Sequence, residues 1–335
     1  MKALAVDPRS TWRTVVSISG LAALAVALLV GIRVGAVPVS LYDIWGVFTA
    51  PVGNEVYQII YNIRVPRVLV GALTGINLAL AGCILQGVLR NPLADPGIIG
   101  VSAGAGLAAM SVMILWPGLT ALVPAVAFAG ALVAAGIVFF LSWDRGGQPL
   151  RLILAGVALA AFFGGGMSAL MVFHSDKVQG TVNWMAGGFQ GRSWDHVRMI
   201  LPYSLAGIVG AMLSYRYLNA LQLGDEVAKG LGVKVETARF SLVVLAALLA
   251  ASAVSVAGLL GFVGLIIPHI TRMLVGSDFE HLMPCAAVLG ATLVVSADTV
   301  ARTVFSPVEV PVGIFMAFLG APFFIYLLRK GRMRR

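Results

Sequence analysis

Long apolar runs without a charged residue constrain this chain more than any other sequence feature. The stretches 96–143 and 240–271 contain no Asp, Glu, Lys or Arg. A helix needs about 20 apolar residues to cross a bilayer core of ~30 Å, so each stretch is longer than one crossing requires. Only 11% of the 335 residues are charged and 59% are apolar, whereas roughly a quarter of the residues in soluble domains are charged. The sequence therefore predicts a polytopic membrane protein and excludes a water-soluble globule.

Dividing the apolar runs at helix breakers predicts about ten membrane spans. The breakers are Trp116-Pro117-Gly118 and Gly258. We expect an all-α protein that forms a single transmembrane domain over residues 1–335, with a retained first span rather than a cleaved signal. The expected spans are 14–36, 66–89, 98–115, 120–143, 152–173, 199–217, 240–257, 259–275, 282–300 and 311–328.

The distribution of basic residues predicts that both termini lie inside the cell. With the N-terminus inside, 16 of the 23 Lys and Arg residues fall on the inner side, as the positive-inside rule requires. The net charge of +9 is then explained by contact with anionic lipid at the inner leaflet. Membrane lipid is therefore an expected partner, and nucleic acid is not.

The predicted spans lack the groups that power transport. Their interiors carry almost no ionisable side chain, and Asp298 lies near the outer end of the ninth span. Ion-coupled carriers use buried carboxylates, lysines or histidines, so a secondary carrier is the less favoured alternative. No Lys is followed by Ser or Thr, which excludes the phosphate-binding loop of a nucleotide-driven pump. We expect a transport subunit that is not an enzyme and that takes its energy from another chain.

Several apparent motifs are better explained by helix packing. Residues 100–104 match G-x-S-x-G, but they open an apolar span without a preceding strand, so an intramembrane hydrolase using Ser102 is disfavoured. Gly71 and Gly75 are spaced for close helix contact, and Asn77 for a hydrogen bond between helices. The two cysteines and four histidines match no ligand spacing, so neither a metal nor a cofactor is expected.

Arg64 and Arg67 lie at the outer entrance of the second span, and Arg302 lies at the outer end of the ninth. They run against the inside-positive bias, and arginine pairs well with carboxylates. The three arginines predict a docking surface for an acidic partner or an anionic substrate, with lipid headgroup contact as the alternative.

Two inner loops also carry information. Residues 90–97 contain two prolines and a terminal glycine, which predict a rigid turn that is either part of a gate or only a tight connection. Residues 221–239 form the longest polar stretch, and apolar residues recur at helical spacing within 223–232. The acidic start of that short helix disfavours an anionic bilayer, so we expect it to bind a partner protein.

The order of these motifs resembles the permease subunits of ATP-binding-cassette importers for ferric siderophores, haem and cobalamin, the type II importers. The resemblance covers nearly the whole chain. It rests on RVPR at 64–67, GCILQG at 82–87, NPLADPG at 91–97, GVSAGAG at 100–106, LAGVAL at 154–159, WMAGG at 184–188, the segment 223–232, GFVGLIIPH at 261–269, PVG at 311–313 and GAPFF at 320–324.

The resemblance implies a complex in the bacterial plasma membrane. Two cytoplasmic ABC ATPase subunits, a second permease copy or a paralogue, and an extracytoplasmic substrate-binding protein are the implied partners. Arg64, Arg67 and Arg302 would meet glutamates of the binding protein, and Asn91 and Leu93 would form one cytoplasmic gate. The implied ATPase-coupling residues are Gly224, Asp225, Glu226, Val227, Ala228, Lys229, Leu231 and Gly232.

A second gate is implied for residues 146–150, including Pro149 and Leu150. This loop reads GGQPL and lacks the hydroxyl residues that are typical of that gate. Within the family a ferric siderophore is the commonest cargo, so it is the predicted substrate, with haem and cobalamin as alternatives.

Overall fold

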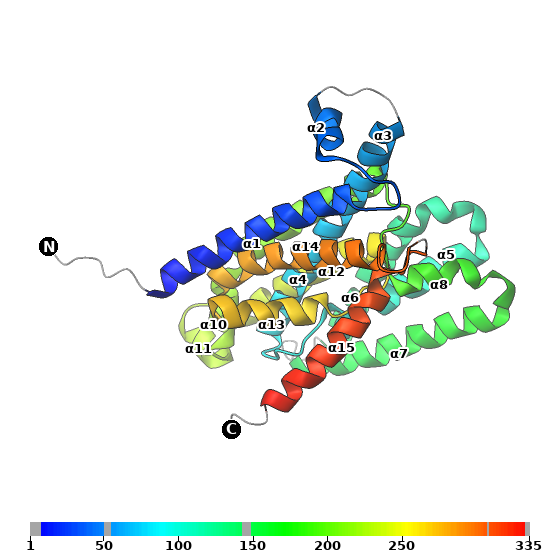
Figure 1. The fold of residues 1–335 in the computed structure, drawn as a ribbon. Helices are drawn as coiled ribbons and strands as arrows, with labels where there is room; N and C mark the ends of the chain where they lie inside the picture. Colours follow the sequence, from blue (N-terminus) through cyan, green and yellow to red (C-terminus); the bar gives the residue numbers. More distant parts are fainter. Residues whose placement is uncertain (1–7, 50–54, 143–148, 307, 332–335) are drawn as a thin grey trace.

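The computed structural model describes residues 8–49, 55–142, 149–306 and 308–331, and every regular element in these ranges is helical (Figure 1). Ten helices correspond one to one to the ten predicted spans. They are α1 (Pro8–Arg33), α4 (Val65–Val88), α5 (Val101–Leu115), α6 (Val123–Ser142), α7 (Pro149–Phe173), α9 (Trp194–Leu213), α12 (Val235–Ala257), α13 (Val263–Val275), α14 (Phe279–Ala301) and α15 (Val312–Gly331). The short helices are α2 (Leu41–Thr49), α3 (Glu55–Tyr57), α8 (Gln179–Ala186), α10 (Tyr215–Gln222) and α11 (Asp225–Gly230).

The helix lengths confirm a polytopic membrane fold. Seven helical segments of the described residues are long and apolar enough to cross a bilayer, and α5, α13 and α15 contain shorter apolar helices. Both predicted breakers end helices: α5 stops before Trp116, and α12 stops before Gly258, which has a φ of +71°. The second span begins earlier than predicted, because the π-helix Gln58–Arg64 joins α3 to α4 without a break.

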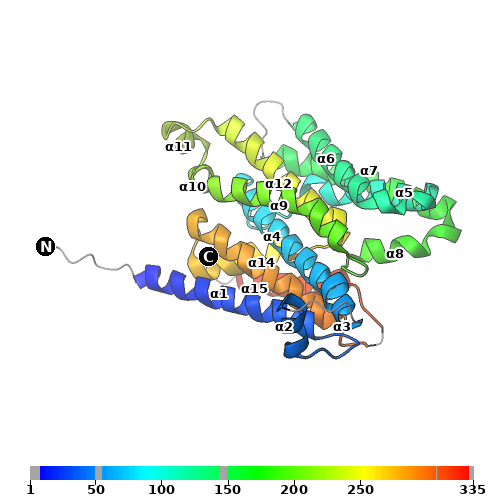
Figure 2. The same cartoon turned by 90° about the horizontal axis from the view of Figure 1, so that it is seen from above.

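Helix α4 lies at the centre of the bundle. It packs against α14, α12, α13 and α9. In the continuous helical segment Glu55–Val88 that contains α4, 78% of the most apolar window is buried, against 11% for α7. Figure 2 shows α5, α6 and α7 on one side of this centre and α1, α14 and α15 on the other. Helix α4 is therefore enclosed by other helices, whereas most of the surface of α7 is exposed.

Glycines allow the close approaches around α4. A Cβ atom on Gly75 would lie 2.2 Å from the Gly290 carbonyl oxygen of α14, and one on Gly82 would lie 2.0 Å from that of Gly264 in α13. Asn77 donates a 2.7 Å hydrogen bond to Ser204 of α9. These contacts confirm the predicted roles of Gly75 and Asn77 in helix packing.

The G-x-S-x-G motif also takes part in helix packing. Its last residue, Gly104, faces α6, where an added Cβ would lie 2.5 Å from the Gly130 carbonyl oxygen. Residue 100, which precedes α5, has a φ of +75°, a conformation that glycine adopts without a steric cost. Both glycines are therefore required by the backbone, which supports the packing interpretation over a nucleophile at Ser102.

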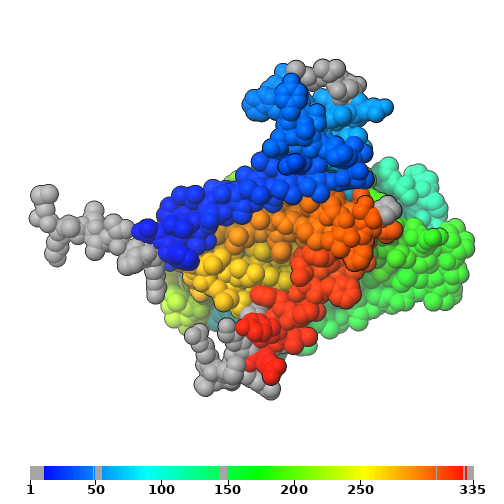
Figure 3. Space-filling model, in the orientation of Figure 1, coloured from blue at the N-terminus to red at the C-terminus, as the bar shows by residue number. Residues whose placement is uncertain are grey.

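The two ends of the bundle carry different short helices. Helices α2 and α3 project from the body next to the end of α1 (Figure 3), and α10 and α11 lie at the opposite end (Figure 1). The predicted orientation makes the α2 end extracytoplasmic and the α11 end cytoplasmic, and it stays a prediction. These ends are called the outer end and the inner end below.

Candidate functional site

Arg67, at the outer end of α4, holds two carboxylates. Its Nε and Nη2 donate to the two oxygens of Asp298 on α14, each at 2.9 Å, and its Nη1 donates to Glu309 at 2.8 Å. The Arg67 and Asp298 side chains are only 10% and 7% exposed. A bidentate pair in this environment fixes the relative positions of the two helices.

Arg64 and Arg302 bind the end of α1. Arg64 donates to the carbonyl oxygens of Ile32 at 2.9 Å and Arg33 at 2.8 Å, and Arg302 donates to that of Gly31. The last carbonyls of a helix lack partners within it and carry partial negative charge, so cationic donors are favourable there. The two guanidinium groups therefore cap α1.

The predicted outer arginines are thus brought together, but they are not exposed. Arg64, Arg67 and Arg302 are 4%, 8% and 8% exposed and contact groups of the same chain. The sequence did not indicate this burial, because it did not show how the end of α1, Asp298 and Glu309 would surround the three arginines. The docking role itself stays a prediction.

A polar cavity of about 210 Å³ opens beside Arg67. Its lining includes Asn183, Arg192 and Glu309. Arg192 donates to the Val256 carbonyl oxygen, and burial lowers its pKa to about 10, so it remains cationic at neutral pH. The outer end therefore combines buried charges of both signs around one opening.

At the inner end, α4 terminates in a left-handed residue. The N–H of Arg90 donates to the Gly87 carbonyl at 3.3 Å, and that of Asn91 donates to Gln86 at 3.2 Å, which is the Schellman pattern of helix ends. The left-handed position is usually glycine, yet here it is Arg90, with a φ of +48°. A residue with a Cβ costs about 1–2 kcal/mol in this conformation.

The predicted gate loop is a rigid turn held at several points. The Asn91 side chain accepts from the Leu93 N–H at 2.9 Å, and Asp95 accepts from the Gly97 N–H at 2.8 Å. Gln86 donates to the carbonyl oxygens of Ala94 and of Gly264 in α13, each at 3.2 Å. Leu93 is 42% exposed, so its side chain can form or lose a contact when a neighbouring segment moves.

The second predicted gate loop is described only in part. Residues 146–148 lie outside the described residues. Pro149 and Leu150 belong to the first turn of α7 rather than to a loop, as suits a proline, whose missing N–H costs nothing at that position. Leu150 is 66% exposed.

The predicted coupling helix forms as α11, which is shorter than the segment 223–232. Gly224, with a φ of +104°, precedes it, and Gly232, with a φ of +81°, follows it. Ala228 is buried against the body, whereas Leu223, Val227 and Leu231 are 62%, 49% and 62% exposed. We call Val227, in α11, together with Leu223 and Leu231, which flank the helix, the α11 apolar face.

Asp225 joins α11 to two arginines. Arg239 of α12 donates from Nη2 to both Asp225 oxygens, at 3.0 and 3.1 Å. The Nη2 of Arg90 lies 3.5 Å from Asp225 Oδ1. We call Arg90, Asp225 and Arg239 the Asp225 cluster. The remaining charged residues of α11, Glu226 and Lys229, pair with each other at 3.3 Å on the exposed side.

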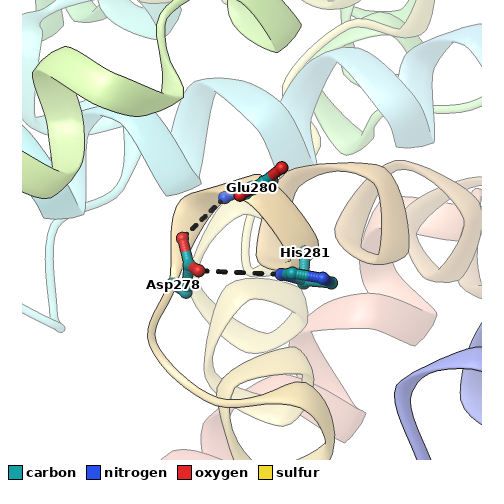
Figure 4. A group of neighbouring side chains, drawn as sticks. All are labelled: Asp278, Glu280 and His281. Atoms are coloured by element: carbon teal, nitrogen blue, oxygen red, sulfur yellow. Dashed lines mark hydrogen bonds and ion pairs between the residues drawn. The ribbon is translucent and has the colours of Figure 1, made fainter. Parts of the chain in front are cut away.

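Asp278, Glu280 and His281 form a group of possible metal ligands (Figure 4). Asp278, however, caps α14: it accepts from the Glu280 N–H at 3.0 Å and from Asn219 of α10 at 2.7 Å. Those hydrogen bonds lower the pKa of Asp278 against the opposing effect of desolvation. The cap accounts for the position of Asp278 without a metal.

Sequence reasoning missed the partners of the arginines. Asp298 and Glu309 follow Arg67 by more than 200 positions, and no local pattern joins them. Arg90 and Arg239 were counted only as inner-side charges. No sequence signal selected Asp225 as a partner of Arg90, because Asp95 and Asp144 are also on the predicted inner side and lie nearer to Arg90 in the sequence.

Comparisons with known proteins identify the family of this chain. The model of the FecCD transport family matches residues 23–330. The iron(3+)-hydroxamate import permease FhuB of Bacillus subtilis is 40% identical over 97% of this chain and 85% of its own length. The hemin permease HmuU of Yersinia pestis is 38% identical over 93% of this chain and 94% of its own length. The cobalamin permease BtuC of Halobacterium salinarum is 41% identical over 82% of this chain and 74% of its own length.

A solved structure has the same fold. It is described as an inward-facing conformation of a putative metal-chelate type ABC transporter, and it matches with a TM-score of 0.82 at 31% identity over 95% of this chain and 99% of its own. The predicted all-α permease fold is confirmed by this match.

Proposed function

Because this chain belongs to the FecCD transport family, we propose that it forms the membrane path of an ATP-driven importer for a ferric siderophore. The family makes it a transport permease and a multi-pass protein of the bacterial plasma membrane. We propose further that residues 1–335 act as one permease domain with both termini in the cytoplasm.

The observation that carries the proposal is the α11 apolar face. Val227 in the short helix α11, and Leu223 and Leu231 on either side of it, expose apolar surface outside the spans. Apolar groups gain free energy when a partner covers them, and grouped exposure of this kind marks interaction sites. A cytoplasmic ATPase is the partner that a permease without its own nucleotide site requires. Two ATPase copies and a second permease copy or paralogue would complete the assembly.

The proposed mechanism is a population shift between two gate states. ATP binding draws the two ATPase subunits together, and α11 moves with them. Asn91 and Leu93 at one gate, with Pro149 and Leu150 at the other, then change between open and closed. A ligand shifts such an equilibrium only by its differential affinity for the two states, so each ATPase state must hold α11 in a different position.

At the outer end we propose docking of an acidic binding protein near Arg64, Arg67 and Arg302. The Arg67 guanidinium already holds Asp298 and Glu309, so a glutamate of the partner would compete with Glu309, whose side chain is 36% exposed. Exchange of one carboxylate for another keeps Arg67 paired and avoids leaving a buried charge alone.

The cargo is tested on the binding protein whose gene neighbours that of the permease. Its bound ligand, released by denaturation and identified by mass spectrometry, is expected to be a ferric siderophore. Relatives of similar identity are named for hydroxamate, haem and cobalamin import. Recovery of haem or cobalamin would contradict the siderophore assignment and leave the importer assignment intact.

A further inference from the structure

We propose that the Asp225 cluster is the mechanical link through which α11 moves the gate loop, with Arg90 as its positioning residue. This inference rests on the proposed function, since it specifies how an ATPase-driven movement reaches Asn91 and Leu93.

The cluster joins α11 and the gate loop, whose movements the proposed mechanism couples, to the buried helix α12. Asp225 is the first residue of α11, Arg90 is the residue directly before Asn91, and Arg239 belongs to α12. One carboxylate thus contacts a guanidinium on each side, at 3.0 Å and 3.5 Å. A displacement of α11 would therefore act on Arg90, the residue directly before the gate residue Asn91.

The two contacts of Asp225 differ in character. The Arg239 side chain is 6% exposed and donates to both carboxylate oxygens, so it anchors α11 to α12. The Arg90 side chain is 41% exposed and makes the longer contact. Partly exposed single contacts are weak and readily exchanged, which suits a link that must change when the gate moves.

Arg90 occupies a position that favours glycine. Its φ of +48° is left-handed, and glycine adopts this conformation without the steric cost that Arg90 bears. Strained residues persist where the surrounding structure holds them, and they gather at switch regions. Arg90 can form an ion pair with Asp225, and a glycine at this position could not.

Gly224 supports the same geometry from the other side. With a φ of +104°, it turns the chain into α11, and a Cβ at this position would lie 3.6 Å from Arg90 Nη1. The guanidinium group therefore lies against the start of α11 as well as against Asp225.

The test uses Arg90→Gly, which removes the side chain and relieves the left-handed strain, so loss of folding is not expected. The full complex with its ATPase subunits carries Leu93→Cys as a reporter, and labelling by a membrane-impermeant maleimide is measured with and without Mg-ATP and vanadate. The native Cys83 and Cys285 are both buried, so background labelling is low.

We expect Arg90→Gly to keep its ATPase subunits while the nucleotide-dependent change in labelling falls at least about fivefold, the lower end of typical coupling between sites. Arg90→Lys, which keeps the charge, should restore most of the change. Adding Arg90→Gly to Asp225→Asn should have little further effect, because both remove the same contact. The control Arg198→Gln removes a 77%-exposed arginine at the outer end and should behave as the wild type.

A full nucleotide response in Arg90→Gly would overturn the link, and so would loss of the ATPase subunits, because Arg90 would then serve docking. If the unsubstituted complex with the reporter binds no ATPase, or its labelling ignores nucleotide, the proposed function fails rather than this inference.

Discussion

Replacing Val227 and Leu231 by aspartate should release the ATPase. The two side chains are 49% and 62% exposed, so about half of each remains for a partner to bury. Full burial of a Val or Leu side chain contributes roughly 1.5–3 kcal/mol. The two together should therefore contribute about 2–3 kcal/mol to binding, and 1.4 kcal/mol is about a factor of ten. We expect affinity for the ATPase to fall by ~30- to 150-fold, and further once the buried carboxylates are counted.

The assay is the dissociation constant of the purified permease for its ATPase subunit in detergent, measured by surface immobilisation. Neither residue contributes to the core, so the variant should stay monodisperse with an unchanged melting temperature. The matched control is Leu41→Asp on α2, where the leucine is 57% exposed at the outer end. Equal affinities for wild type and the double variant would refute the coupling role of α11.

Three other predictions address the bundle and its outer end. Gly82→Ala should push α4 away from α13, because the added Cβ would lie 2.0 Å from the Gly264 carbonyl oxygen. We expect the free energy of unfolding to fall by about 1–3 kcal/mol. The control Gly136→Ala, with no neighbour within 4 Å, should not lower the melting temperature. Arg67→Met leaves Asp298 buried and unpaired and should lower the free energy of unfolding by about 3–5 kcal/mol. Arg198→Met, which removes an exposed pair, should change it by less than about 1 kcal/mol. Similar melting temperatures for the two variants would contradict the stabilising role of the buried pair. Charge reversal at Arg64 and Arg67 should weaken docking of the binding protein at physiological salt more than Asp298→Asn does, with folded fractions matched by size exclusion, and unchanged docking would count against the outer site.

The sequence was sufficient for the spans because hydrophobicity and length decide them locally. The cuts at Trp116 and Gly258 were predictable for the same reason, since a breaker acts on its own segment. The boundary before α4 was not predictable, because the π-helix Gln58–Arg64 continues the chain without a breaker.

Contacts between distant segments were beyond the sequence. The environment of Arg64 depends on where α1 ends, and that of Arg67 depends on two carboxylates supplied from the other end of the chain. The left-handed backbone of Arg90 was hidden as well, because glycine, the usual sign of that conformation, is absent there. The residue types indicated which inner loops are candidate functional segments. Only the fold showed that Asp225 connects Arg90 before the gate loop with Arg239 of α12.

The most direct test of the central claim is uptake into proteoliposomes that contain the permease with or without its ATPase. The probe is the ligand recovered from the binding protein, presented on that protein and labelled with radioactive iron where it is an iron chelate. Accumulation is expected only with the ATPase present and Mg-ATP on its side of the membrane, and a proton or sodium gradient should have no effect. Uphill uptake by the permease alone, driven by either gradient, would contradict the account.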